Sequence, residues 1–225
     1  MAQGISAGRR RPQLHLITDP RLSRPALLDA VARAVTAGVD VVQVREKSAP
    51  ARELLSLVLA VRDRIRGRAL LIVNDRIDVA LAANIDGVHL AAKSLSPDIA
   101  RRLLGPHRHV GISVHSHDEA VQAERAGADS VTFGHIFATP SHPGIPPRGL
   151  ELLRNLVEFV TVPVIAIGGI GPDHVRRVMA VGASGIAVIS TILEASDPAE
   201  AATALRTALD TPLITLATRG ATRGE

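Results

Sequence analysis

The stretch Ala126-Gly127-Ala128-Asp129-Ser130-Val131-Thr132-Phe133-Gly134-His135 carries the pattern from which the fold can be inferred. A helical segment stops at a glycine, a short apolar run with β-branched residues follows, and a polar side chain ends it. The phrases Ala37-Gly38-Val39-Asp40 and Val181-Gly182-Ala183-Ser184 lead into further apolar runs in the same way. The chain is therefore expected to alternate strands and helices.

Eight such units can be placed along the chain. Strands are predicted over Leu14–Thr18, Val41–Glu46, Leu70–Asn74, Gly87–Leu90, Val110–His115, Ser130–Phe137, Pro163–Gly169 and Gly185–Ser190. Helices are predicted over Pro25–Ala37, Ala51–Arg66, Arg76–Ala83, Ser96–Leu104, His117–Ala126, Gly149–Val157, Pro172–Val181 and Pro198–Leu209. Eight repeats predict a single (β/α)8 TIM barrel over residues 12–210, with a doubly wound open sheet as the alternative. Residues 1–11 are expected to form a disordered or extended N-terminal tail, and residues 211–225 a C-terminal tail.

Composition narrows the classes of function. The 225 residues carry a net charge of +4 and include no Cys, Trp or Tyr and three Phe. Disulfides, thiolate catalysis and Cys-ligated metals are therefore excluded, and there is little aromatic surface for stacking bases. Because the basic residues are scattered, we expect no nucleic-acid partner and favour an anionic small substrate. No apolar run approaches the roughly 20 residues that span a bilayer, and Met1–Arg11 lacks the apolar core of a secretory signal, so a cytoplasmic protein without a membrane partner is expected.

The second predicted strand carries an unusual polar face. Gln43, Arg45 and Lys47 alternate along it, whereas Val42 and Val44 take the opposite face. Barrel enzymes form their active sites at the carboxyl ends of the strands. We therefore expect these three long polar side chains to bind the substrate.

Polar side chains also mark the ends of neighbouring strands. Asn74 closes the third predicted strand, Ser113 lies in the fifth, and His135 follows the apolar part of the sixth. An imidazole titrates near neutral pH, so His135, before a loop rich in Pro and Gly, is the candidate for moving a proton. His89 and His115 are interpreted as structural.

Glycines at the end of the seventh strand predict a phosphate site. Gly168 and Gly169 precede Gly171-Pro172, which is typical of a helix start, and would let backbone N–H groups approach an anion. Ile189 and Ser190, at the end of the eighth predicted strand, would add further donors. The loops after strands seven and eight often bind phosphate in TIM barrels, so a phosphorylated substrate is expected.

The chain contains five motifs in a specific order: Val42-Gln43-Val44-Arg45-Glu46-Lys47, Val73-Asn74-Asp75-Arg76, Asp86-Gly87-Val88-His89-Leu90, Gly111-Ile112-Ser113-Val114-His115-Ser116 and Ala166-Ile167-Gly168-Gly169-Ile170. Together they resemble the thiamine phosphate synthase/TenI superfamily over nearly the whole chain, from Leu14 to Leu209. The resemblance implies a (β/α)8 barrel, in agreement with the repeat count.

That superfamily contains two chemistries. Its synthases join a pyrimidine pyrophosphate to a thiazole phosphate, using Mg²⁺ held by two acidic residues; one matches Asp75, but Ser94, next to Lys93, stands at the other. Their Thr-x-Thr-Lys after strand six is replaced by Thr139-Pro140-Ser141-His142, and their usual Gly-Pro by Gly134-His135. These departures resemble the TenI branch, the thiazole tautomerases.

The resemblance to that branch implies an isomerase of thiamin biosynthesis that converts a carboxythiazole phosphate to its aromatic form. His135 would transfer the proton, Arg45 and Lys47 would hold the substrate carboxylate, and Asn74 and Ser113 would orient the ring. A phosphorylated thiazole carboxylate is then the partner, no cofactor or metal is required, and a homodimer is expected. The alternatives are a thiamine phosphate synthase and a non-catalytic ligand-binding or regulatory barrel whose basic surface contacts DNA.

Overall fold

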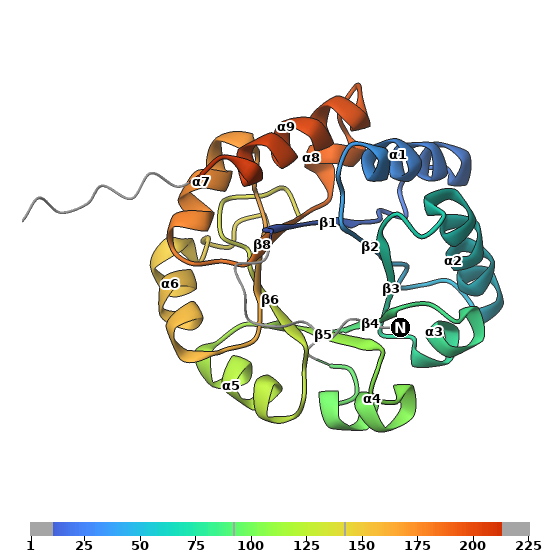
Figure 1. Ribbon diagram of the computed structural model, residues 1–225, viewed down its shortest axis with the longest axis horizontal. Coiled ribbons are helices and arrows are strands. Elements are labelled where there is room, and N and C mark those ends of the chain that lie inside the picture. Colours follow the sequence, from blue (N-terminus) through green and yellow to red (C-terminus); the bar gives the residue numbers. More distant parts are fainter. Residues whose placement is uncertain (1–10, 92, 142, 213–225) are drawn as a thin grey trace, which may run out of the picture.

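A computed structural model describes residues 11–91, 93–141 and 143–212. Eight parallel strands pair in chain order, and β8 pairs with β1 to close a barrel. Helices surround this barrel on all sides (Figure 1). The predicted single (β/α)8 barrel is confirmed, and the doubly wound open sheet is excluded because the sheet has no edge.

The observed elements follow the predicted units closely. The strands are β1 Gln13–Ile17, β2 Val41–Val44, β3 Leu70–Asn74, β4 Gly87–Leu90, β5 His109–Val114, β6 Ser130–Gly134, β7 Val164–Ile167 and β8 Gly185–Val188. The helices are α1 Arg24–Thr36, α2 Ala51–Ile65, α3 Ile77–Ala83, α4 Pro97–Leu104, α5 His117–Arg125, α6 Gly149–Phe159, α7 Pro172–Ala180, α8 Ser190–Leu193 and α9 Pro198–Asp210. The short helix α8 was not predicted, because four residues hold too little of the 3.6-residue period to signal a helix. Ser190 therefore begins a helix instead of ending a strand.

Most of the predicted tails lie outside the described residues; Arg11, Thr211 and Pro212 are the described exceptions. The Arg11 guanidinium donates to the carboxylate of Asp210, with Nη2 2.9 Å from Oδ2. This ion pair joins the segment before β1 to the end of α9.

Alternation along the strands divides apolar from polar side chains. Leu14 and Leu16 of β1 belong to the large apolar cluster between the strands and the helices, which is the main core. A small second cluster of Ile17, Ile165 and Ala187 belongs to the opposite faces of β1, β7 and β8, inside the barrel. Much of the rest of the interior is polar, although barrel interiors are usually filled by branched apolar residues. The buried polar side chains on the strands are His15, Gln43, Asn74, His89, Ser130 and Thr132.

A pair of hydrogen bonds recurs between neighbouring strands at their amino ends. The side chain of the residue just before each even-numbered strand accepts the backbone N–H of a residue in the preceding strand. The backbone N–H of the first residue donates in turn to the carbonyl of that strand residue. The four pairs are Asp40 with Leu14, Asp86 with Leu71, Asp129 with Val110 and Ser184 with Val164. The four pairs anchor the end of the barrel that lies opposite the predicted site, so these polar residues serve the fold.

A buried arginine attaches the last helix to this end of the barrel. Arg206 of α9 is 6% exposed. It donates to Asp40 (Nη1 to Oδ2, 2.9 Å) and to Asp210 (Nη2 to Oδ1, 2.7 Å), and Nη2 also donates to the carbonyl of Pro12 (2.9 Å). One guanidinium thus links β1, the start of β2 and α9.

Candidate active site at the carboxyl ends of the strands

A chain of amide and carboxylate groups crosses from β2 to the end of β3. Gln43 Nε2 donates to Asn74 Oδ1 at 3.1 Å, and Asn74 Nδ2 donates to Asp75 Oδ2 at 2.7 Å. Gln43 and Asn74 are buried inside the barrel. The structure therefore brings two predicted substrate-binding residues together and leaves them oriented by the carboxylate of Asp75.

The carboxylate of Asp75 is held from the next loop as well. Oδ1 accepts the backbone N–H of Ala91 at 2.8 Å and also the hydroxyl of Ser94. Asp75 has a φ of +61°, in the left-handed region that an aspartate tolerates better than most residues. Three donors from β3 and from the loop after β4 therefore converge on this one carboxylate.

His89 of β4 and Ser113 of β5 form a second pair, with Nε2 2.9 Å from Oγ. Burial lowers the pKa of His89 to about 4, the positive potential of His109 and Arg45 adds to this, and Asp75 opposes it. The imidazole is therefore neutral near pH 7, and it fixes the orientation of the Ser113 hydroxyl. His89 was interpreted as structural from the sequence, and this contact makes it a direct support of a predicted binding residue.

Positive charge enters the site from the end of β2. Arg45 is half-buried, and its backbone N–H donates to Thr18 Oγ1 at 2.9 Å, which joins the ends of β2 and β1. Its guanidinium lies close enough to influence the pKa values of both His89 and Asp19. The strand face predicted for Gln43, Arg45 and Lys47 includes only Gln43, because β2 ends at Val44. Lys47, three residues beyond that end, is exposed.

His135, just beyond β6, lies against the long loop that follows it. The residue is 6% exposed, and its Nε2 lies 3.2 Å from the carbonyl oxygen of Ile145. A carbonyl can only accept, so Nε2 donates in this hydrogen bond. Arg148 secures the end of the same loop, because its Nε donates to the carbonyl of Gly134 and its Nη1 to that of His115, both at 2.8 Å. The imidazole therefore supports the β6–α6 loop.

The two glycines after β7 are required by their backbone and by their neighbours. Gly168 and Gly169 have φ of +99° and +66°, values that favour glycine. A Cβ on Gly168 would lie 2.3 Å from His135 Cβ, and one on Gly169 would lie 2.4 Å from the carbonyl oxygen of Ala138. The structure therefore packs the predicted phosphate loop directly against the segment that contains His135.

The ends of β7 and β8 are tied to each other. Thr191 Oγ1 donates to the carbonyl of Ile170 at 2.8 Å, so the loop after Gly169 contacts the start of α8. Ile189 precedes the first residue of that helix, Ser190. The four residues predicted to bind phosphate therefore come from two segments that are in contact.

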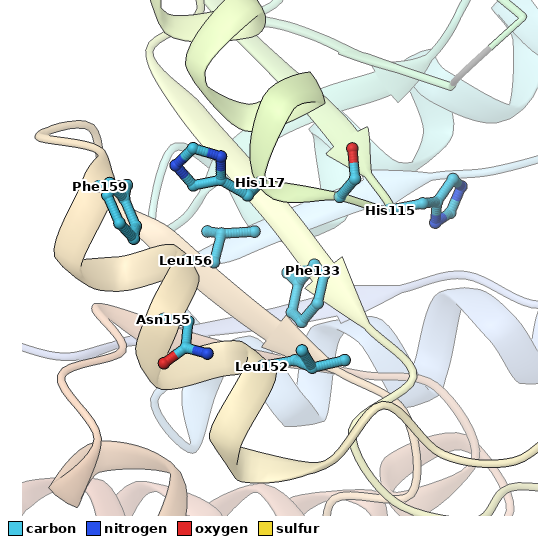
Figure 2. A pocket seen from close by; sticks show the side chains of 8 residues that line it. His115, His117, Phe133, Leu152, Asn155, Leu156 and Phe159 are labelled. Atoms are coloured by element: carbon cyan, nitrogen blue, oxygen red, sulfur yellow. The ribbon is translucent and has the colours of Figure 1, made fainter.

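A separate pocket of about 420 Å³ opens between α5 and α6, with β6 behind it (Figure 2). Its wall is mostly apolar and is lined by Phe133, Leu152, Leu156 and Phe159. His117 lies beside them and packs edge to face on Phe159, with 4.2 Å between the ring centroids. The ring of His115 points away from this cluster in Figure 2. Phe133 belongs to the core between strands and helices, so the pocket lies outside the barrel and is poorly suited to a phosphate.

Two interior histidines were missed from the sequence. His15 Nε2 lies 2.9 Å from Gln13 Oε1, and His109 Nε2 lies 3.0 Å from Ser130 Oγ. Both alternate with apolar residues along their strands, as Gln43 does, and that alternation was the available signal. They extend the polar interior below the pair of His89 and Ser113.

The described residues hold no group of three or more His, Cys, Asp or Glu side chains arranged for a metal ion. Within the same ranges, every helix is too short or too polar to cross a membrane.

Comparison with known proteins resolves which branch of the superfamily this barrel resembles. Residues 14–192 match the family model described as thiamine monophosphate synthase. The chain belongs to the thiamine monophosphate synthase family. A thiamine-phosphate synthase of Chlorobium phaeovibrioides is 46% identical over 87% of this chain and 93% of its own length. One from Moorella thermoacetica is 46% identical over 81% of this chain and 88% of its own length.

Solved structures agree with this family assignment. A thiamine phosphate pyrophosphorylase from Pyrococcus furiosus superposes with a TM-score of 0.80 and 39% identity, covering 89% of this chain and 96% of that one. A 3-hexulose-6-phosphate synthase superposes with a TM-score of 0.71 at 22% identity, which shows the shared fold alone.

The expectation of a thiazole tautomerase, and with it an isomerase, is wrong. The relatives of this family member are named synthases, which are transferases, and the similarity extends along almost their whole length. The expectation rested on a few local departures, such as Ser94 and His135. A hydroxyl or an imidazole at one position does not specify a reaction, and 46% identity over most of the chain outweighs these departures. The acid/base role of His135 was expected as part of the isomerisation, and it is not carried over to a synthase.

Proposed function

We propose that this chain is a thiamine-phosphate synthase. The proposal is carried by the 46% identity to a synthase over 93% of that relative's length. In the reaction, the ring nitrogen of a thiazole phosphate attacks the methylene carbon of a pyrimidine pyrophosphate. A C–N bond forms, the C–O bond to the pyrophosphate breaks, and pyrophosphate leaves with the bonding electrons. The nitrogen attacks with its lone pair, so the step requires no proton carrier.

The polar edge of the barrel suits two anionic substrates. Arg45 and Lys47 at the end of β2 provide cations for phosphate oxygens, and the guanidinium can bind two oxygens at once. Asn74 and Ser113 are held in place by Gln43 and His89, so they can orient a heterocycle without losing further side-chain freedom. A phosphorylated thiazole is the expected partner, and a homodimer stays a prediction.

The loops after β7 and β8 are proposed to hold the thiazole phosphate. Gly168 and Gly169 remove the side chains that would separate the backbone from an anion. Ile189 and Ser190 contribute backbone and hydroxyl donors from the start of α8. His135 then acts as a positioning residue, because it contacts both this loop and the β6–α6 loop.

The family's Mg²⁺ is a component that these residues do not fit. Magnesium requires a near-octahedral set of oxygen ligands, usually including carboxylates. Asp75 matches one of the two acidic residues that the resemblance assigns to the metal, and donors from Asn74, Ala91 and Ser94 already engage both of its oxygens. No reaction step is therefore assigned to a metal here.

The test is to supply both substrates and to measure pyrophosphate release and product formation, with and without Mg²⁺. Release with stoichiometric product is expected. Arg45→Gln should reduce kcat/KM strongly, whereas Arg52→Gln, on the exposed face of α2, should leave it unchanged. A folded wild-type protein that released no pyrophosphate in either condition would refute the proposal.

A further inference from the structure

The carboxylate of Asp75 is satisfied by protein donors alone. Oδ2 accepts the amide of Asn74 at 2.7 Å, and Oδ1 accepts the N–H of Ala91 at 2.8 Å together with the hydroxyl of Ser94. These three donors already occupy lone pairs on both carboxylate oxygens. Any metal at this edge would have to compete with those donors for the oxygen lone pairs.

Ser94 is built into the turn that delivers it. Its N–H donates to the carbonyl of Ala91 at 2.9 Å, and its Oγ accepts the N–H of Ala91 at 2.8 Å while its proton points to Asp75. The hydroxyl therefore occupies the space next to Asp75 Oδ1. An aspartate at position 94 would place a second carboxylate there, and two adjacent carboxylates favour a divalent cation between them.

The local charge also disfavours a cation. Arg45 directly follows β2 and Asp75 directly follows β3, and these two strands are neighbours in the barrel, so a cation and this carboxylate lie at the same edge. Lys93 directly precedes Ser94 in the chain. The other carboxylate that Arg45 influences, that of Asp19, is paired with Arg21, with Nη2 2.6 Å from Oδ2. The described residues also hold no ligand cluster, so this edge lacks the negative charge that a resident Mg²⁺ needs.

From this disagreement we infer that the Ser94–Asp75 hydrogen bond replaces the metal site of the family in this chain, and that a single substitution at position 94 separates the two states. The inference deepens the proposed function and rests on it, because it concerns how the same site handles pyrophosphate. The protein without substrates has little affinity for Mg²⁺, and Ser94→Asp creates a site.

The test uses Mn²⁺, which prefers the same oxygen ligands as Mg²⁺, and counts free ion by electron paramagnetic resonance without substrates. Ser94→Asp should bind Mn²⁺ at least about tenfold more tightly than the wild type, since ligand charge sets affinity at such sites. Ser94→Asn is the matched control, because it has the shape of aspartate without the charge, and it should bind no better than the wild type. Circular dichroism melting verifies that each variant is folded.

Two results would overturn the inference. One is a wild type that binds Mn²⁺ as tightly as Ser94→Asp; the other is Ser94→Asp binding no more tightly than Ser94→Asn. Asp75→Asn adds an independent check, because it should leave the weak wild-type binding unchanged, and a clear loss would show that Asp75 already holds a metal. Pyrophosphate release is measured on the same samples. If the wild type and every variant release no pyrophosphate, the synthase proposal is refuted, while the Mn²⁺ titration still decides the inference.

Discussion

Mild acid should destabilise this barrel through the histidines of its interior. Burial, with smaller contributions from His109 and His89, lowers the pKa of His15 to about 3, and burial, then His109, lowers that of His89 to about 4. Burial also lowers the pKa of His109, although Asp129 opposes the shift. In the unfolded chain the same imidazoles titrate near about 6.5. Below that pH these histidines bind protons in the unfolded chain but not in the folded barrel. The free energy of unfolding therefore falls as the pH falls, and it has its full value above about pH 7.

The size of the loss follows from the pKa shifts of His15 and His89. Each pH unit between the unfolded and folded pKa values removes about 1.4 kcal/mol per histidine. At pH 5, which lies about 1.5 units below the unfolded value, His15 and His89 each remove about 2 kcal/mol. Their combined loss of about 4 kcal/mol is a large part of the 5–15 kcal/mol that typically stabilises a domain.

Urea unfolding followed by circular dichroism at several pH values from 7.5 to 5 measures this loss. The window lies above the range where carboxylates with lowered pKa values, such as Asp210, begin to titrate. His15→Gln and His89→Gln should each flatten the slope by about 1.4 kcal/mol per pH unit below pH 6, whatever they do to stability at pH 7.5. His107→Gln, at an exposed position, is the control and should leave the slope unchanged. A stability that is constant from pH 7.5 to 5, or slopes that both interior variants leave intact, would refute the reasoning.

Three further outcomes are expected. Replacing Arg206 by Leu should lower the unfolding free energy by about 3 kcal/mol, because the carboxylate of Asp40, at the amino ends of the strands, loses its cation. Unchanged denaturant midpoints would contradict this. Gly168→Ala should lower both stability and pyrophosphate release, since its Cβ would overlap His135, whereas Gly171→Ala, with open space around it, should melt like the wild type. His135→Phe should accelerate limited proteolysis of the β6–α6 loop and raise KM more than it lowers kcat, and a selective loss of kcat would argue against a positioning role.

Local sequence pattern predicted the order and type of nearly all the elements. Short β-branched runs, amphipathic helices and glycine stops repeat eight times, and the period of the apolar residues distinguishes a strand from a helix. The alternation with valines also correctly placed Gln43 on the face of β2 opposite Val42 and Val44, although the strand ends before Arg45. The same rule applied to His15 and His109 would have revealed more of the polar interior. The four-residue helix that begins at Ser190 is too short for the apolar period to predict it.

The site was only partly predictable, for a physical reason. Sequence placed Asn74, Ser113, His135 and the glycines after β7 at one end of the barrel, because strand order dictates where strand ends meet. It did not show that His135 donates to the carbonyl of Ile145, and it suggested a proton carrier in its place. A side chain's hydrogen-bond partner comes from a different loop, which local pattern does not specify.

The sequence by itself determined that this chain repeats a strand and a helix eight times and has polar side chains at the carboxyl ends of its strands. The pairing of β8 with β1 decided between a closed barrel and an open sheet. Only the tertiary structure showed which side chains at those carboxyl ends are hydrogen-bonded to each other. Asp75 and Ser94 are separated by a helix and a strand along the chain, yet their side chains meet in a hydrogen bond. Whether a serine at position 94 is a harmless substitution or a replacement for a metal ligand depends on that meeting, and such contacts form only when the barrel closes.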